Sequence, residues 1–325
     1  MCARSVALGL LPCPCGHHFF LEGGAVFWCL IYTDCMRSVE RIEISAEPSE
    51  GEKAALLKLL ADDDPAIYQT VRKKILSCGA SALSWLRPHA LSREPMLRRR
   101  ALEIIAHFDR QAADNRFLAF CLRSGEDFDL EEGAWLLAQT RYPDINPAGY
   151  RALLDSYAEE LERRLEFTSE TKKSLSAINY YLFEELRFAG NEENYYDPES
   201  SYLNRVVDRR KGNPISLCLL YILLARRLQL PVAGIGLPGH FICRYQSSEM
   251  EIYLDAFNRG KFLTKADCVH YLQQGNYSIR EEYLAPVSSR RLLLRVCSNL
   301  HQIYEHMELA DEITRLQRYR VALSR

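Results

Sequence analysis

Apolar residues recur at helical spacing along most of the N-terminal half of the chain. In residues 52–60 and 67–76 they follow one another at intervals of three and four, which places them on one face of a helix. Asp64 and Pro65 suit the cap and the first turn of the second helix. The same spacing predicts helices over residues 80–89, 95–108, 117–122, 130–140, 147–165 and 171–187. We therefore predict an entirely helical half, whose short helices within residues 36–110 resemble degenerate HEAT-type units.

The pattern changes after a polar loop at residues 191–204, which is rich in Tyr, Asn and Asp. Residues 215–225 are apolar on nearly all sides, which predicts a helix buried on most of its surface. Asn213 is a suitable N-cap for this helix, and Pro214 suits its first position. Strands are predicted over residues 232–237, 241–245 and 251–257, with a hairpin turn at 246–250. A buried helix on a small antiparallel sheet, between helical flanks, predicts an α+β fold that is mostly α.

The C-terminal tail returns to the helical pattern. Residues 292–305 and 310–321 predict a helix pair about the size of one tetratricopeptide-type unit. A single unit of this kind cannot bury its own apolar face. We therefore expect the tail to pack against the rest of the chain.

Composition narrows the range of partners. Of the 325 residues, 48% are hydrophobic and 26% are charged, as in an ordinary soluble protein. The formal net charge of −2 provides no clustered basic face for nucleic acid or an anionic membrane. The basic run at residues 98–100 lies in a helical pattern and is interpreted as a solvated face. Beyond residue 35 the cysteines are scattered singly, which is typical of a reducing compartment, and we expect a cytoplasmic protein.

The first 35 residues differ from the rest because five of the 11 cysteines crowd there. The motif CPCGHH at residues 13–18 contains zinc-ligand side chains, but no second pair follows at the spacing of a zinc site. The apolar runs are too short to span a bilayer, and no small-residue cleavage site follows them. We interpret residues 1–35 as an upstream extension, with a natural start at Met36. The acidic loop at 191–204 lacks the ligand alternation of a calcium loop, so no metal or cofactor is expected.

One region brings together a thiol, an imidazole and a carboxylate. Cys218 lies in the predicted buried helix, while His240 and Asp255 belong to the predicted strands. A thiol activated by an imidazole, which is in turn oriented by a carboxylate, is the arrangement used in nucleophilic catalysis by cysteine. These three residues are the candidate catalytic site.

Four stretches carry a family resemblance: LEEGAWLLAQTRYPDIN, FAGNEENYYDPESSYLNRVVDRRKGNPISL, GIGLPGHFICRY and YLDAFNRGKFL. Through them, and over about residues 62–304, the chain resembles the SirB family of transglutaminase-like proteins with a tetratricopeptide-like tail. The resemblance implies a Cys-His-Asp site at the start of a helix and on two following strands. The imidazole position matches His240 and the carboxylate position matches Asp255. Pro214 occupies the position of the nucleophilic cysteine.

Replacement of that cysteine by proline removes the features on which cysteine catalysis depends. A thiol in the first turn of a helix has its pKa lowered by the dipole and the free N–H groups, which also form an oxyanion hole. Cys218 lies one turn deeper than Pro214, about 6 Å along the axis, and is more simply interpreted as a core thiol. Cys243 is predicted to face away from His240, and Ser216 more often caps a helix than attacks a substrate. His240 and Asp255 are still expected to hydrogen-bond each other.

The sequence supports two functions of different classes. The first is a catalytically degenerate transglutaminase-like protein that binds another protein or peptide and regulates it, without nucleic-acid or membrane partners. The alternative is a cysteine-dependent hydrolase or acyltransferase of the protease or amidase type, using Cys218, His240 and Asp255. The predicted divisions are an extension at 1–35, HEAT-like helices at 36–110, a SirB-type helical region at 111–200, a transglutaminase-like core at 201–285 and a tetratricopeptide-like tail at 286–325.

Overall fold

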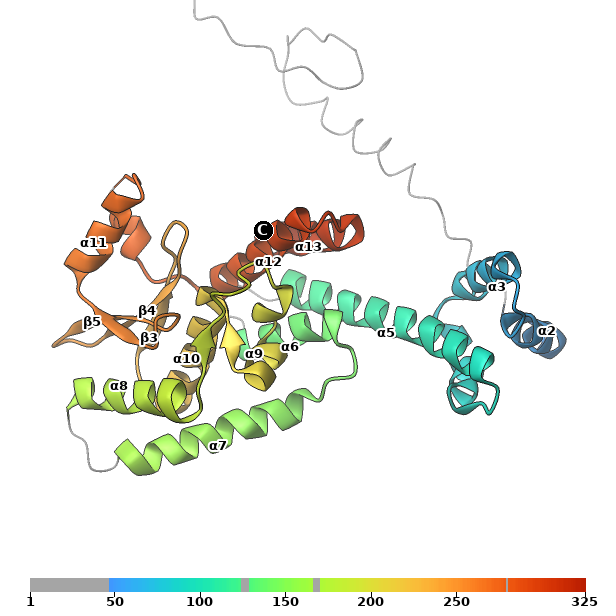
Figure 1. Cartoon of the computed structure of the whole chain (residues 1–325), viewed down its shortest axis with the longest axis horizontal. Coiled ribbons are helices and arrows are strands. Elements are labelled where there is room, and N and C mark those ends of the chain that lie inside the picture. The colour runs from blue at the N-terminus through green and yellow to red at the C-terminus, as the bar shows by residue number, and fades with distance from the viewer. Residues whose placement is uncertain (1–46, 124–128, 166–169, 279) are drawn as a thin grey trace, which may run out of the picture.

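The structure is a computed structural model that describes residues 47–123, 129–165, 170–278 and 280–325 (Figure 1). The extension at residues 1–35, with its cysteines and its CPCGHH motif, lies outside the described residues. The described chain is mostly helical with small sheets, so the α+β, mostly α prediction is confirmed.

An N-terminal helical cluster has a hydrophobic core of its own. It is made by α2 (Glu50–Leu60), α3 (Pro65–Ser77), α4 (Leu83–Leu86) and the first part of α5 (Pro95–Arg123). Ser49 and Glu52 form a capping box on α2, and Asp64 caps α3 as its position predicted. The helix predicted at residues 80–89 is instead α4 between two short 3-10 segments, Gly79–Ala82 and Arg87–Leu91. Gly79, with a φ of 68°, and Pro88 interrupt the α-helical hydrogen bonding there.

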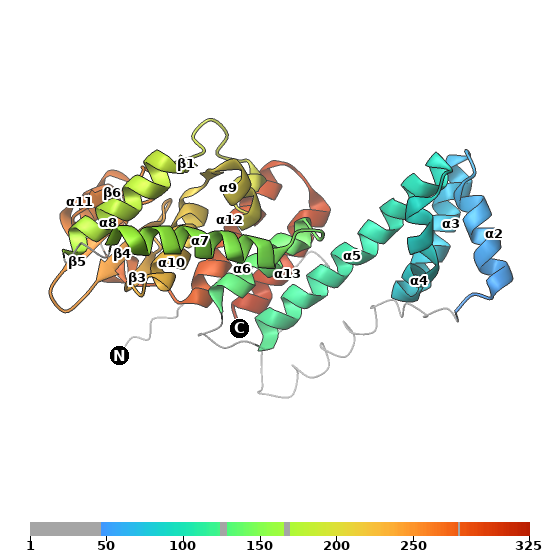
Figure 2. The same cartoon turned by 90° about the horizontal axis from the view of Figure 1, so that it is seen from below.

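Helix α5 connects this cluster to the main body (Figures 1 and 2). The prediction of two helices at 95–108 and 117–122 was wrong, because one helix runs through both. The intervening polar stretch contains neither Gly nor Pro, so nothing in it stops a helix. The predicted division between residues 110 and 111 falls inside α5.

The main body is organised around α10 (Pro214–Arg227), whose first twelve residues are all buried. Four further helices belong to the same main body as α10 (Figure 2): α6 (Leu130–Arg141), α7 (Pro147–Leu165), α8 (Thr171–Asn179) and α9 (Leu203–Arg209). The helix predicted over residues 171–187 is α8 followed by a π-helical turn, Tyr180–Glu185. Short strands β1 (Ala189–Gly190) and β2 (Lys211–Gly212) pair in parallel just before α10.

A four-stranded antiparallel sheet packs against α10. Its strands follow chain order: β3 (Val232–Ile235), β4 (Ile242–Gln246), β5 (Glu251–Asp255) and β6 (Lys261–Leu263). Cys243 pairs with Leu254 in the β4–β5 register. The strand β6 and the helix α11 (Lys265–Gln274) were not predicted. Together with the sheet, α11 encloses a smaller core, so the sheet has a helix on each face.

The tail helices α12 (Ser289–His306) and α13 (Ala310–Leu323) pack on each other and on α5 and α6. Arg290, which is 7% exposed, donates hydrogen bonds to the carbonyls of Leu323, Ala322 and Cys121 at 2.8, 2.6 and 3.1 Å. The tail therefore packs against the rest of the chain, as predicted. In the described parts of the chain, no helix is both long enough and apolar enough to cross a membrane.

Candidate functional site

The site is built on the tight turn that follows β5. Asp255 ends the strand, and its Oδ1 accepts hydrogen bonds from the backbone N–H groups of Phe257 and Asn258 at 3.0 and 3.2 Å. Gly260 closes the turn by donating its N–H to the Asp255 carbonyl at 2.8 Å. Its φ of +70° favours glycine, and a Cβ there would lie 2.4 Å from the Asn179 side chain. Asn179 donates to the Gly260 carbonyl at 2.6 Å, so the end of α8 holds this turn in place.

His240 meets the carboxylate of this turn from the loop before β4. Its Nε2 lies 2.8 Å from Oδ2 of Asp255, and Nδ2 of Asn258 donates to the same oxygen at 2.8 Å. An ionised carboxylate only accepts hydrogen bonds, so Nε2 carries the proton and a neutral imidazole keeps its lone pair on Nδ1. The His240 side chain is 15% exposed, which leaves it accessible to a ligand.

Asp255 is ionised at neutral pH. Burial by itself would raise its pKa, but the hydrogen bond and charge of His240, together with the hydrogen bonds from Asn258, outweigh it and hold the pKa below its usual value. A buried carboxylate with this many donors is a stable orienting group for the imidazole.

Cys218 lies on the other side of the sheet. It is fully buried, its thiol is 3.5 Å from the Phe241 carbonyl, and the Cys243 thiol is 3.7 Å from the Cys218 carbonyl. Burial, the neighbouring Cys243 and the charge of Asp255 raise the Cys218 pKa well above its usual value. The thiol is therefore protonated at neutral pH and is a poor nucleophile.

The alternation of side chains explains this separation. Phe241, Cys243 and Leu254 belong to the main core, which also contains Cys218. Ile242 and Tyr253 point to the opposite face and belong to the smaller core against α11. Asp255 shares the face of Tyr253 by the same alternation. The structure brings His240 and Asp255 together and places Cys218 on the α10 side of the sheet.

The start of α10 is closed by a capping network rather than an open anion site. Asn213 accepts a hydrogen bond from the Ser216 N–H at 2.9 Å, and Ser216 Oγ accepts one from the Asn213 N–H at 3.0 Å. The fully buried Ser216 hydroxyl also donates to the Ser200 carbonyl at 2.6 Å. Pro214 supplies no N–H at all. Ser216 is thus a cap, and the first turn offers few free donors for a developing oxyanion.

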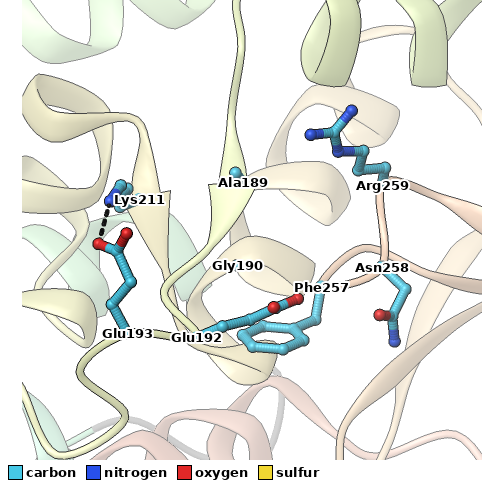
Figure 3. A pocket seen from close by; sticks show the side chains of 8 residues that line it. All are labelled: Ala189, Gly190, Glu192, Glu193, Lys211, Phe257, Asn258 and Arg259. Atoms are coloured by element: carbon cyan, nitrogen blue, oxygen red, sulfur yellow. Dashed lines mark hydrogen bonds and ion pairs between the residues drawn. The ribbon is translucent and has the colours of Figure 1, made fainter.

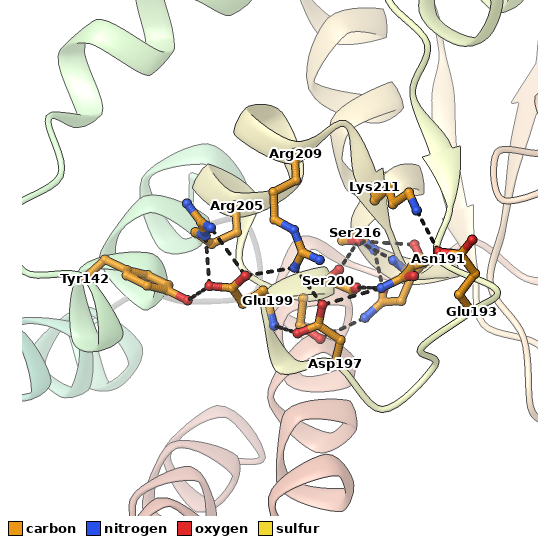
Figure 4. Close-up of polar contacts among 12 residues, drawn as sticks. Tyr142, Asn191, Glu193, Asp197, Glu199, Ser200, Arg205, Arg209, Lys211 and Ser216 are labelled. Atoms are coloured by element: carbon orange, nitrogen blue, oxygen red, sulfur yellow. Dashed lines mark hydrogen bonds and ion pairs between the residues drawn. The ribbon is translucent and has the colours of Figure 1, made fainter.

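The polar loop at residues 191–202 is anchored by the same network (Figure 4). Asn191 donates to Ser200 Oγ at 2.9 Å, and Arg209 joins Asp197 and Glu199 at 2.6 and 2.8 Å. The Glu199 carboxylate also accepts a hydrogen bond from Nε of Arg205 at 3.0 Å. These carboxylates are occupied by arginines. Across the described residues, no group of three or more His, Cys, Asp or Glu side chains is arranged to hold a metal ion.

Two cavities flank this turn. The histidine cavity, of about 250 Å³, is lined by Leu237, His240, Ile242, Asp255, Asn258, Lys261, Leu263, Asp267, Cys268 and Tyr271. The strand cavity, of about 370 Å³, is lined by Ala189, Gly190, Glu192, Glu193, Lys211, Phe257, Asn258 and Arg259 (Figure 3). Asn258 lines both cavities, so they lie on either side of this residue.

Three residues of the histidine cavity escaped the sequence analysis. Asn258 holds the Asp255 carboxylate, and the Tyr271 hydroxyl donates to the Pro238 carbonyl at 3.2 Å beside His240. Cys268 places a thiol in this cavity, but burial and the charges of Asp267 and Asp255 raise its pKa to about 11. The signal for Asn258 was present in the turn sequence DAFNRGK. The other two lie on α11, whose position on the sheet only the fold reveals.

The mostly helical α+β fold is consistent with a transglutaminase-like domain. Residues 148–298 match the family model described as the transglutaminase-like superfamily. The chain is 36% identical over 196 residues to a UPF0162 protein of Xylella fastidiosa (strain Temecula1), covering 58% of this chain and 70% of that protein. The chain belongs to this family of transglutaminase-like proteins.

Other relatives match over regions of different length. A UPF0162 protein of Vibrio cholerae is 33% identical over 137 residues, which cover 41% of this chain and 51% of that protein. F-box only protein 21 of Mus musculus is 37% identical over 134 residues, or 39% of this chain and 21% of that protein. The human F-box only protein 21 is 30% identical over 231 residues, or 62% of this chain and 36% of that protein. The comparison with solved structures found no match.

Proposed function

We propose that this chain is a catalytically degenerate transglutaminase-like protein of the SirB type that acts as a protein-binding or regulatory module. The observation that carries the proposal is Pro214 at the position of the nucleophilic cysteine, at the start of α10. Proline has neither a thiol to attack with nor an N–H to stabilise an oxyanion.

The nearest thiol on the same helix supports this proposal. Cys218 is fully buried, its pKa is raised, and it lies among core side chains on the α10 face of the sheet. His240 and Asp255 remain a hydrogen-bonded pair that can bind and orient a ligand group without a protein nucleophile.

The arrangement of the chain also suits a binding module. In F-box only protein 21 the matching region is 36% of a longer human protein, so a related region occurs there joined to other sequence. The helical flanks, with a HEAT-like cluster before the transglutaminase-like core and a tetratricopeptide-like pair after it, offer surface for a protein or peptide partner in the cytoplasm.

The alternative function is that of a cysteine-dependent hydrolase or acyltransferase using Cys218, His240 and Asp255. It requires the buried thiol to become exposed and ionised when substrate binds, which would need α10 and the sheet to separate.

Alkylation of the native protein separates the two functions. The full chain is treated with iodoacetamide between pH 5 and pH 9, and the labelled cysteines are mapped by mass spectrometry. We expect Cys218 to remain unlabelled until denaturant is added, at the same rate in wild type and in a His240→Ala variant. Selective labelling of native Cys218 at low pH that disappears in His240→Ala would contradict the proposal and establish a thiol enzyme.

A further inference from the structure

The histidine cavity has a mixed lining, in which apolar side chains lie beside polar and charged ones. Leu237, Ile242 and Cys268 are almost fully buried around it, and Leu263 adds a partly exposed wall. Of its lining residues, Asn258 also lines the strand cavity. A space of about 250 Å³ with such walls accommodates one large aliphatic or aromatic side chain.

The neighbouring strand β1 has a free edge. Ala189 and Asn191 donate their N–H groups to the carbonyls of Arg210 and Gly212, both at 2.9 Å. Successive residues of a strand point their backbone groups to alternate edges, so the N–H and C=O of Gly190 point away from β2. Among the residues that the structure describes, β1 pairs with β2 alone.

This edge faces the turn that carries the site. Figure 3 shows β2 on one side of β1, and Asn258 and Arg259 on the other. The Phe257 ring packs against Gly190 so closely that a Cβ there would lie 2.6 Å from it. The same ring contacts the His240 imidazole edge-on, with centroids 6.3 Å apart. The backbone of Gly190, the ring of Phe257 and the imidazole of His240 thus lie next to one another in this order, along the path that a ligand would follow.

Both basic side chains of the strand cavity have acidic partners within the chain. Lys211 pairs with Glu193 at 3.0 Å, and Arg259 lies 3.6 Å from Glu184. Two basic and two acidic side chains line the strand cavity, so it carries no net formal charge. The strand cavity therefore does not favour a highly charged ligand, and the apolar side chains of the histidine cavity are left to provide specificity.

We propose that the two cavities together bind an extended peptide segment, whose backbone pairs with Gly190 and whose large apolar side chain enters the histidine cavity. The proposal rests on the proposed function, since it gives the binding module its site. Strand addition at an exposed edge gives affinity through main-chain hydrogen bonds and specificity through alternate side chains. Asn258, which lines both cavities, marks where the peptide passes from one to the other.

The first test selects ligands without assuming one. A phage library of random heptapeptides is panned on the immobilised full chain, and the enriched sequences are synthesised. We expect them to share one Leu, Met, Phe or Ile at a fixed position, without a conserved charge. Enriched peptides that lack a common apolar position would overturn the proposal, as would the absence of any enriched peptide.

A matched pair of variants then locates the binding. Leu263→Trp places a bulky indole ring in the histidine cavity. Phe262→Trp enlarges the neighbouring side chain of β6, and that side chain packs against the main core instead. With both variants folded by circular dichroism, we expect the selected peptide to bind Leu263→Trp at least about tenfold more weakly than wild type, and Phe262→Trp unchanged. Equal binding to all three proteins would place the ligand elsewhere and reject the site.

Backbone pairing is tested on the ligand itself by replacing each peptide N–H with N-methyl, one at a time. Paired N–H groups alternate along a strand, so we expect roughly tenfold losses of affinity at one or two alternate positions and small changes between them. Uniform sensitivity, or none, would reject strand addition. If these tests fail and Cys218 remains inert to iodoacetamide, only the proposed peptide site is rejected. A reactive Cys218 would instead reject the proposed function itself.

Discussion

At the scale of single residues, Asp255 shows how a buried charge is kept. Each oxygen of its carboxylate accepts two hydrogen bonds, from two backbone N–H groups on one side and from His240 and Asn258 on the other. An ionised carboxylate has about four acceptor sites, and here all are used. The residue therefore orients His240 and also holds the turn after β5.

Replacing Asp255 with Asn removes this ionised acceptor. We expect Asp255→Asn to lower the free energy of unfolding by about 1–3 kcal/mol at pH 7, because buried donors lose a charged partner. Urea denaturation of the full chain, followed by circular dichroism, measures the difference.

The same pair of proteins tests the pKa of Asp255. Its folded pKa lies below the usual value of 3.8, so its contribution to stability is present above that value and is lost as pH falls through the lower folded pKa. The gap in stability between wild type and Asp255→Asn should therefore be constant from pH 7 to about pH 5 and shrink toward pH 2. A gap that does not change with pH would show that the carboxylate is not preferentially ionised in the folded state.

At the scale of elements, the site depends on a short turn rather than on a long helix or strand. Gly260 adopts a φ of +70° against the Asn179 side chain, which lies where α8 gives way to a π-helical turn. Turns of this kind often mark functional positions in helices. Here Asn179, at the end of α8, donates a hydrogen bond to the turn that carries Asp255.

We expect Gly260→Ala to destabilise the chain by about 2–4 kcal/mol, since a Cβ would be strained by the backbone and would collide with Asn179. Gly51→Ala is the matched control, because its Cβ would meet nothing within 4 Å in the first turn of α2. The control should be neutral or stabilising by up to about 1 kcal/mol. Thermal and urea unfolding of both variants measure this, and equal effects would mean that the turn is not constrained.

At the scale of the whole molecule, the core of the N-terminal cluster and the main core are joined by one helix. The N-terminal cluster packs around residues such as Leu60, Ile75 and Leu86, whereas the main core surrounds α10. Helix α5 contributes side chains to both. Separate cores of this kind can open separately.

Ile75→Ala should therefore destabilise the N-terminal cluster locally, by about 2–5 kcal/mol. Native-state hydrogen exchange read by mass spectrometry should show faster exchange in residues 50–91, with α10 and β4 unchanged. Leu220→Ala, in the buried face of α10, should give the opposite pattern. Equal acceleration throughout the chain in either variant would show a single cooperative unit.

The sequence by itself determined the features that depend on local pattern. The apolar stripe and the capping residues predicted α2, α3, α6, α7, α10 and the tail helices, because a cap and a periodicity of 3.6 residues are properties of neighbouring positions. It also identified His240 and Asp255, since the stretches around them carry the family resemblance. Local pattern was weaker where no breaker marked a change, as along α5 and at the π-helical turn after α8.

Only the tertiary structure decided which residues from distant parts of the chain become neighbours. Cys218 and His240 are 22 positions apart in the sequence, and whether they meet depends on which face of β4 packs on α10. Cys268 joined the site, and β1 paired with β2, through contacts between segments that are distant in the sequence. The physical reason is that periodicity reports how deeply a residue is buried, whereas its neighbours are set by the packing of elements that the chain brings together only on folding.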